Sequence, residues 1–260
     1  MGKDNTGTKT GKKKTKLVLI AGIISLVVVL LLVAFIFYEV KVLPATIMEN
    51  KYNEAIRCIQ SAEIYKAQDL LYELGDYKDS KERLLEIATK NTKVRFGPYE
   101  WIVLDRDGND MLLLLNTKEF DVNQDNRNDS RQPYHTARED VTWETSYIRS
   151  WLNDDFYNTF TDVEKAMIMQ THCTNPDNPH FHSSGGNDTD DFVFLLSPQE
   201  ADQYKTVGLK YGTIWWLRMP GDTQITAAVV QPLGNIDDKG LVVNEEKAVR
   251  PAIRIRFSDN

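Results

Sequence analysis

One long apolar segment near the N-terminus dominates the pattern of hydrophobic and polar positions. Leu17 to Tyr38 carry no charged side chain, and only Gly22 and Ser25 interrupt the large aliphatic and aromatic residues. As an α-helix this segment would span about 33 Å, which is enough for a bilayer core of about 30 Å. It exceeds the apolar core of a signal peptide, about 7–15 residues, and no small-residue cleavage site follows closely. We therefore expect an uncleaved transmembrane helix at residues 17–38.

Lysines gather on one side of this segment. Residues 1–16 contain six lysines and one aspartate, whereas only Lys41 lies near the other end. The remaining 244 residues carry 25 basic and 37 acidic side chains. By the positive-inside rule, we expect residues 1–16 to form a basic cytoplasmic tail. The chain would then cross the plasma membrane once and place everything after residue 38 outside the cell.

A helical pattern follows over residues 45–91. Three groups of apolar residues recur at spacings of three and four, which is typical of amphipathic helices. Gly75 is placed to end the second helix, and Asp79 with Glu82 is placed to open the third as a capping box. Cys58 lies here and is expected to be a small buried hydrophobe. We expect a helical spacer that holds the next domain off the membrane.

From residue 93 the pattern becomes strand-like. Residues 94–104 and the apolar run 111–115 are separated by a turn, which predicts a β-hairpin. The C-terminal part adds four strand-like stretches, at 214–219, 225–230, 241–243 and 249–257. The last stretch alternates strictly, which predicts a half-exposed antiparallel strand with Arg250, Ala252, Arg254 and Arg256 on its outer face.

Short helices are predicted between these strands. Trp143 and Trp151 fall on one face of a helical pattern, and Thr161 begins a capping box for another helix. Ser197 precedes a proline and stands three positions before Glu200, which is a strong helix start. For residues 93–258 we expect an α+β domain with an antiparallel sheet, short helices and long polar loops.

Composition and charge narrow the classes of protein. With 42% apolar and 27% charged residues, the chain is typical of a folded protein. Its two cysteines are too few for a disulfide framework or a four-thiolate zinc site. Nothing in the net charge of −7 favours nucleic acid, so we expect no such partner. The common catalytic motifs for hydrolases, nucleotides and zinc are absent from the sequence, so we expect neither catalysis nor a cofactor.

Trp216 and Arg218 are the candidate ligand-binding residues. They share one face of a predicted strand (IWWLRM), because side chains two positions apart point the same way. A tryptophan beside a guanidinium can hold sugars or peptides by stacking and paired hydrogen bonds. The loops at 171–191 and 220–224 are expected to flank this strand end. The alternative is structural: Trp216 packs in the core and Arg218, like Arg250, pairs with a buried carboxylate.

Three histidines are candidate metal ligands. His172, His180 and His182 lie within eleven residues, and Cys173 follows the first. Imidazole and thiolate groups bind zinc and copper, and a His-x-His pair can supply two ligands. The alternative is chance clustering in an exposed polar loop, because the spacing matches no structural zinc motif.

Two acidic stretches imitate calcium sites. Residues 121–129 alternate acidic and amide side chains, but Asn126 replaces the required glycine and Gln132 the bidentate glutamate. A second group, at 188–191, follows two glycines. Solvated turns are the preferred interpretation of both.

Several motifs resemble a known family. The runs are FGPYEWIVLD, TWETSYIRSWLNDDF, GGNDTDDFVFLLSPQEA, WWLRMPG and VRPAI. They resemble a bacterial domain-of-unknown-function family of Gram-positive surface and membrane-anchored proteins. Their order is similar to C-type-lectin-like domains, including the formylglycine-generating-enzyme branch, which implies that fold for residues 93–258. That family usually has serine where Met219 stands. The branch's enzymes use a cysteine pair, whereas this domain has only Cys173, so the activity is not carried over.

The segment YELGDYKDSKERL resembles a tetratricopeptide-like unit. Little more than one unit is present, so a spacer is favoured over a peptide-binding groove. The function we expect is therefore a membrane-anchored extracellular binding module for a glycan, a peptide or an envelope component, without catalysis. The alternatives are an envelope assembly or structural protein and a metal-dependent extracellular enzyme.

Overall fold

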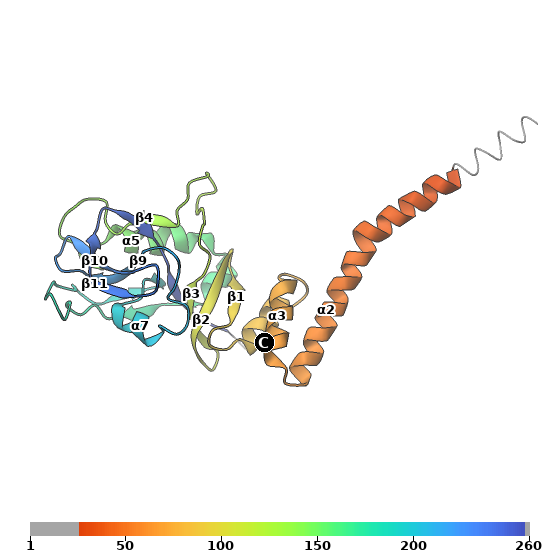
Figure 1. Ribbon diagram of the computed structural model, residues 1–260, viewed down its shortest axis with the longest axis horizontal. Helices are drawn as coiled ribbons and strands as arrows, with labels where there is room; N and C mark the ends of the chain where they lie inside the picture. The colour runs from red at the N-terminus through yellow and green to blue at the C-terminus, as the bar shows by residue number, and fades with distance from the viewer. Residues whose placement is uncertain (1–25, 258–260) are drawn as a thin grey trace, which may run out of the picture.

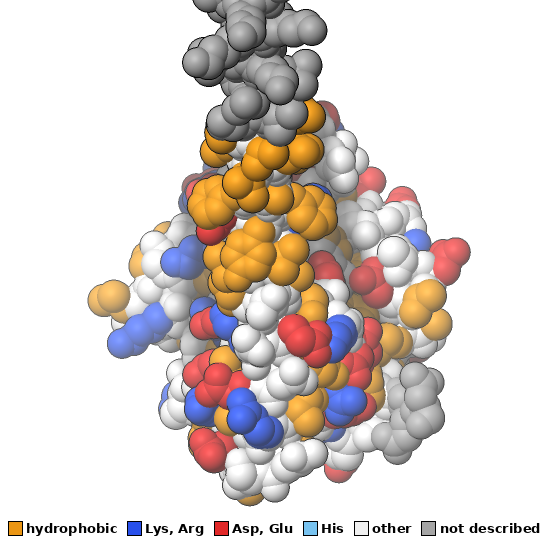
Figure 2. Space-filling view, turned by 90° about the vertical axis from the view of Figure 1, so that its right-hand side faces the viewer, with side chains coloured by type: hydrophobic (Ala, Val, Ile, Leu, Met, Phe, Trp, Pro, Cys, Tyr) orange, Lys and Arg blue, Asp and Glu red, His pale blue; other side chains and the backbone are white. Residues whose placement is uncertain are grey.

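A long helix projects from the folded body of the protein. The computed structural model describes residues 26–257, so residues 1–16 and the first part of the predicted transmembrane helix, 17–25, lie outside the described residues. The helix Leu26–Gln60 is long and apolar enough to cross a membrane. Figure 1 shows it leaving the body at one end, and Figure 2 shows apolar side chains gathered along it. The apolar segment is thus helical where it is described.

This helix changes its winding where the apolar segment ends. A π-helical turn, Tyr38–Val42, precedes the helix α2, Leu43–Gln60, and the N–H of Leu43 donates to the carbonyl of Tyr38. Pro44 has no N–H to donate to the preceding turn, and proline commonly disturbs a helix at this point. Figure 1 shows a bend between the N-terminal part of the helix and α2.

Two further helices pack beside α2. They are α3, Ile64–Leu74, and α4, Ser80–Ile87. Gly75 ends α3 with φ of 57°, as predicted. The capping box predicted at Asp79 is wrong, because its side chain makes no cap bond and instead pairs with the Tyr52 hydroxyl and with Arg83. Cys58 is buried on α2, as predicted.

The helices dock on the β-sheet region and share its core. Arg106, on the strand β2 (Tyr99–Asp107), donates to the carbonyls of Leu85 and Ala88 at 2.7 Å each. The N–H of Asn91 donates to the carbonyl of Val103 at 2.8 Å. Buried residues of α3 and α4 belong to the same apolar cluster as the sheets. The segment 45–91 is therefore packed against the next region.

The first sheet lies next to these helices. Its order is β1-β2-β3-β13-β5, β8 also pairs with β13, and all pairs are antiparallel. The predicted hairpin forms strands β2 and β3. The strands are β1 (Lys93–Phe96), β2 (Tyr99–Asp107), β3 (Asp110–Leu115), β5 (Ile168–Met169), β8 (Val193–Phe194) and β13 (Ala252–Arg256).

The second sheet has the order β11-β10-β9-β12-β4, with β9 at its centre. Only the β9–β12 pair is parallel. A separate two-stranded sheet joins β6 and β7. The strands are β4 (Arg131–Pro133), β6 (Thr171–Cys173), β7 (Thr189–Asp191), β9 (Trp215–Pro220), β10 (Thr226–Val230), β11 (Ile236–Val242) and β12 (Glu246–Ala248). The predicted α+β class with antiparallel sheets is confirmed.

Short helices connect the sheets. The helix α5, Tyr147–Trp151, continues as a π-helix, Leu152–Phe156, and a 3₁₀ turn, Tyr157–Thr159. The helices α6, Asp162–Met167, and α7, Pro198–Gln203, each begin with a complete capping box. These two starts are confirmed because capping depends on side chains only three residues apart.

The last strand differs from its prediction. Strand β13 begins only at Ala252, and Arg250 is buried before it rather than placed on an outer face. The guanidinium of Arg250 donates to the carbonyls of Leu115 and Gly208, and lies 4.6 Å from the ring centre of Tyr211. Its partners are thus carbonyls and a ring. Ala252 is also buried, because β13 lies inside the sheet.

Candidate functional site

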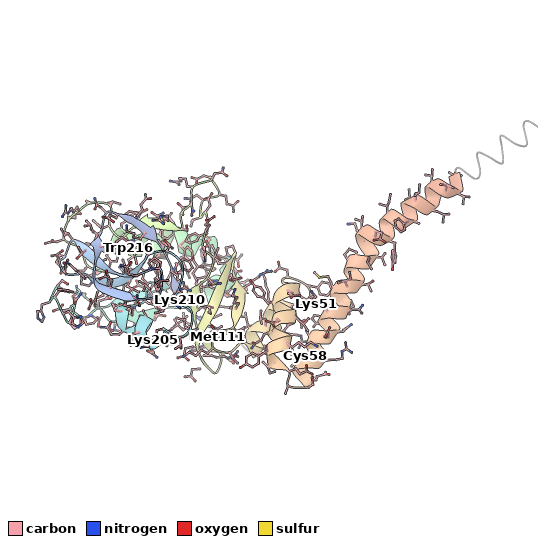
Figure 3. All side chains as sticks on the ribbon, viewed as in Figure 1. Lys51, Cys58, Met111, Lys205, Lys210 and Trp216 are labelled. Carbon is pink, nitrogen blue, oxygen red and sulfur yellow. The ribbon has the colours of Figure 1, made fainter. Side chains whose placement is uncertain are left out.

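Trp216 lies in the interior. Strand β9 is central in its sheet and all six of its residues are buried, so both faces are covered. The indole N–H of Trp216 donates to the carbonyl of Gln132 at 2.9 Å, and its ring packs edge-on against Tyr134 at 5.8 Å. Figure 3 shows Trp216 within the sheet-rich body, far from Cys58 on α2. The pairing of β9 with β10 is irregular between Trp216 and Pro220, and both Trp216 and Arg218 are buried, so the predicted open strand face is not seen.

Arg218 connects three segments. Its Nη1 donates to the carbonyl of Leu195 at 2.9 Å and pairs with the carboxylate of Glu200, and its Nη2 donates to the carbonyl of Thr174 at 3.3 Å. Glu200 also caps α7 through the N–H of Ser197. The predicted structural alternative, a pairing of Arg218 with a carboxylate, is therefore present in the structure.

The same arginine reaches a small internal cavity. This cavity, of about 10 Å³, is lined by Arg218, Asn175, Gln199 and Met219 among others. Arg218 and Asn175 each also carry a buried side-chain atom without a hydrogen-bond partner among the described residues: Nε of Arg218 and Oδ1 of Asn175. An unpaired donor and an unpaired acceptor on two residues that line one cavity are consistent with a place for a small polar group.

An open groove lies next to the cavity. It measures about 410 Å³, and Gln199 and Met219 line both the groove and the cavity. Polar side chains meet apolar ones along its wall. The other lining residues are Pro179, His180, Pro198, Asp202, Ile236 and Asp238. We call this site the β9 groove.

The loop between β6 and β7 is fastened to the end of β9. Asn178 is fully buried, and its Nδ2 donates to the carbonyls of Pro220, Gly221 and Asp238 at 2.9–3.1 Å. Gly221 permits this close packing, since a Cβ there would lie 2.3 Å from the carbonyl oxygen of Lys239. The predicted flanking of the strand end by loops 171–191 and 220–224 is therefore seen.

The three histidines have different neighbours. His172 lies on β6 with Nδ1 2.9 Å from Asp190, whereas His180 pairs with Asp238 in the β9 groove. His182 is exposed, with φ of 61°. Within residues 26–257, no group of three or more His, Cys, Asp or Glu side chains is arranged to hold a metal ion. The metal site remains a prediction, without a preformed ligand set in the described part of the chain.

Both cysteines are free and buried. Burial raises the pKa of the Cys173 thiol to about 12. The thiol is therefore protonated at neutral pH, and a protonated thiol is a poor nucleophile and metal ligand.

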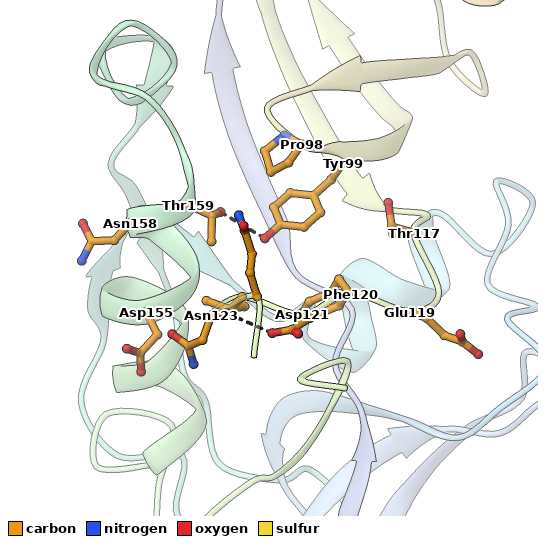
Figure 4. A pocket seen from close by; sticks show the side chains of 12 residues that line it. Pro98, Tyr99, Thr117, Glu119, Phe120, Asp121, Asn123, Asp155, Asn158 and Thr159 are labelled. Atoms are coloured by element: carbon orange, nitrogen blue, oxygen red, sulfur yellow. Dashed lines mark hydrogen bonds between the residues drawn. The ribbon is translucent and has the colours of Figure 1, made fainter. Parts of the chain in front are cut away.

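A second cavity lies elsewhere and was not anticipated from the sequence. It measures about 650 Å³ and has a floor of Tyr99 and Phe120 (Figure 4). The carboxylates of Glu119, Asp121 and Asp155 are on its wall. The Asp121 carboxylate accepts hydrogen bonds from the N–H groups of Asn123 and Asn126. In the loop that resembles a calcium site, this carboxylate is therefore paired with backbone of the same loop. We call this site the Tyr99 cavity.

The residues of the β9 groove and of the adjoining small cavity were mostly missed by sequence reasoning. Met219 drew attention only as a departure from a resembling motif, and Asn175, Gln199 and Asp238 carried no signal. They come from four segments that converge only in the folded chain. His180 was noted, but as a metal ligand.

The chain combines a long apolar helix with an α+β domain of mainly antiparallel sheets. The family model described as Domain of unknown function (DUF6273) matches residues 107–257, more than half of the chain, so the chain belongs to this family. The prediction of a domain-of-unknown-function family is thus confirmed. The chain has no significant match among curated proteins or among solved structures. The β9 groove lies wholly within the matched region, whereas Tyr99 lies outside it.

Proposed function

We propose that the chain is a single-pass membrane protein whose folded region binds a ligand outside the cell. The anchoring part is supported by the exposure of Leu31, Phe37 and the other apolar side chains on the helix, which water would solvate at a cost in free energy. The lysines of residues 1–16 support a cytoplasmic N-terminus. In a bilayer the same apolar side chains face lipid.

The proposed binding function rests on one observation. The open β9 groove adjoins the buried Arg218, whose Nε–H has no hydrogen-bond acceptor among the described residues. Ligand sites commonly combine apolar walls with a few fixed polar groups, and this groove does so. All of its lining residues fall in the region that defines the family. Arg218 is then the buried end of the site, and Trp216 supports the strand that carries it.

The finer description extends the same proposal. The order of the sequence motifs supports a C-type-lectin-like arrangement of residues 93–258 and a place at the bacterial cell surface. A tetratricopeptide-like origin is proposed for the helices at 45–91. Binding is favoured over catalysis by a cysteine nucleophile, because burial keeps the Cys173 thiol protonated at neutral pH.

The experiment compares two matched charge reversals in the full-length protein. Glycan and peptide arrays are probed with the wild type, with Asp202→Lys in the β9 groove and with Asp155→Lys in the Tyr99 cavity. Both aspartates are exposed, so neither change should alter the fold. We expect array ligands to be lost with Asp202→Lys and kept with Asp155→Lys. Loss with Asp155→Lys alone would place the site in the Tyr99 cavity, and an array without any ligand would contradict the binding function.

A further inference from the structure

Two buried polar atoms beside β9 point to the chemistry of the missing partner. The side chain of Arg218 is 4% exposed and Asn175 is 7% exposed, yet Nε of the first and Oδ1 of the second have no partner among the described residues. Both residues line the same small cavity. Burial without a partner costs free energy, because each group gives up a hydrogen bond to water. The cavity therefore calls for a group that accepts from one atom and donates to the other.

Size and chemistry together fit either a water molecule or the hydroxyl group of a ligand. A cavity of about 10 Å³ holds one group of the size of a water molecule. A hydroxyl oxygen accepts from Nε–H and donates its own hydrogen to Oδ1. A carboxylate can only accept and an ammonium can only donate. A carboxamide has both functions, but it needs room for two polar heavy atoms.

The groove outside the cavity fits the rest of a polyhydroxylated ligand. Asp202 pairs with Lys205 through Oδ1, and Asp238 pairs with His180 through Oδ2. Their second carboxylate oxygens can accept from further hydroxyl groups, and Gln199 offers an amide. Pro198 and Ile236 supply apolar surface for the C–H face of a sugar ring. Neither lysine nor arginine lines the groove itself, and the carboxylates of Asp202 and Asp238 disfavour an anionic ligand there.

We propose that the β9 groove binds a neutral saccharide and that one of its hydroxyl groups enters between Arg218 and Asn175. The hydroxyl passes Met219 and Gln199, which line both spaces. This inference rests on the proposed binding function and names the class of its ligand. Asn175 and Arg218 then select for the presence of one particular hydroxyl.

The first test measures this selection in the wild-type protein. Full-length protein is kept in a zwitterionic detergent, because alkyl glycosides would themselves present sugar hydroxyls. Glucose, galactose, mannose and N-acetylglucosamine are screened by saturation-transfer NMR, and every monodeoxy analogue of the strongest binder is titrated. We expect one analogue to bind at least about tenfold more weakly than the parent sugar, because the missing hydroxyl group leaves Nε of Arg218 and Oδ1 of Asn175 unpaired.

The second test uses variants of the cavity. In Asn175→Leu the acceptor is gone but Nε of Arg218 still donates. The parent sugar should therefore bind more weakly than it binds the wild type, and its advantage over that one deoxy analogue should shrink. Asn175 also donates to the carbonyl of Asn187, so thermal unfolding must show that the variant folds. If it does not fold, Met219→Phe is used instead, since a larger side chain narrows the entrance and should also weaken binding of the parent sugar. Asp155→Asn in the Tyr99 cavity is the control and should change nothing.

Several results would overturn the inference. One is equal binding of every deoxy analogue, and another is sugar binding that neither Asn175→Leu nor Met219→Phe weakens. A third is a crystal structure in saturating sugar that shows only a resident water between Nε and Oδ1. If no saccharide binds, but a peptide binds the wild type and not Asp202→Lys, the saccharide inference is overturned and the proposed binding function stays intact.

Discussion

At the scale of single residues, Arg218 joins three segments next to the β9 groove. Replacing Arg218 by Leu removes its hydrogen bonds to two carbonyls and leaves the carboxylate of Glu200 without its partner. Breaking a buried ion pair from one side commonly costs about 3–5 kcal/mol. Because Glu200 keeps partial access to water, we expect a loss near the lower end, about 3 kcal/mol. Urea unfolding of the detergent-solubilised protein measures it.

The matched control is Arg256→Leu. Arg256 pairs with Asp110 at 2.6 Å, but it is exposed, and exposed ion pairs contribute little. A similar loss in both variants would show that Arg218 is no more important than a surface arginine. That result would remove its role as the fixed end of the groove.

His172 predicts a pH dependence. Its ring is 61% exposed, and a hydrogen bond to Asp190, with Asp188 nearby, raises its pKa above the ordinary value. A raised pKa means that the folded state binds the proton more tightly than the unfolded state does. The stabilisation is therefore complete below about pH 6.5 and is lost as the pH rises through the raised pKa. NMR titration of the ring should give a pKa above 6.5, and the matching pH-dependent part of thermal stability should be absent in His172→Gln.

Sequence reasoning at this scale succeeded where the signal was local. Both complete capping boxes were predicted, because they depend on neighbours only three positions away. The prediction that Arg250 lies on an outer face was wrong, because alternation along a strand does not show whether a second layer covers that face. The orphaned atoms of Asn175 and Arg218 depend on how three segments meet, and no local pattern records that.

At the scale of elements, the helices α3 and α4 support the first sheet. Removing residues 26–92 would uncover β1 and β2 and deprive Arg106 of both carbonyl acceptors. We therefore expect a fragment of residues 93–257 to unfold at a lower temperature than a fragment of residues 43–257. Circular dichroism on heating compares them. Equal unfolding temperatures would mean that the helices are only a spacer, as the sequence alone suggests.

The elements that the sequence predicted are those with a clear periodic pattern of hydrophobic residues. The hairpin β2–β3 and the strands β9 and β10 were expected within a few residues of their observed bounds. The strands β4, β5, β8 and β12 are only two or three residues long, too short to show alternation. The capping box at Asp79 failed because Tyr52, on another helix, competes for the same carboxylate.

At the scale of the whole molecule, the proposed topology is testable in cells. The asymmetric lysines predict that a tag at the C-terminus is outside and one at the N-terminus is inside. Protease added to intact, wall-stripped cells should remove the C-terminal tag and spare the N-terminal one. Protection of the C-terminal tag until the membrane is broken would reverse the orientation. Replacing the lysines of residues 12–16 by glutamine should weaken the preference.

The helix Leu26–Gln60 has a consequence for how the protein would meet its ligand. Because α2 continues the apolar segment with only a π-helical turn between them, no flexible tether joins anchor and body in the described chain. The 18 residues of α2 add about 27 Å of rise beyond that turn. If the helix is anchored in a bilayer, the folded region stays at a nearly constant height above it. Its encounters are then set by diffusion within the membrane plane, and a ligand fixed at another height would stay out of reach.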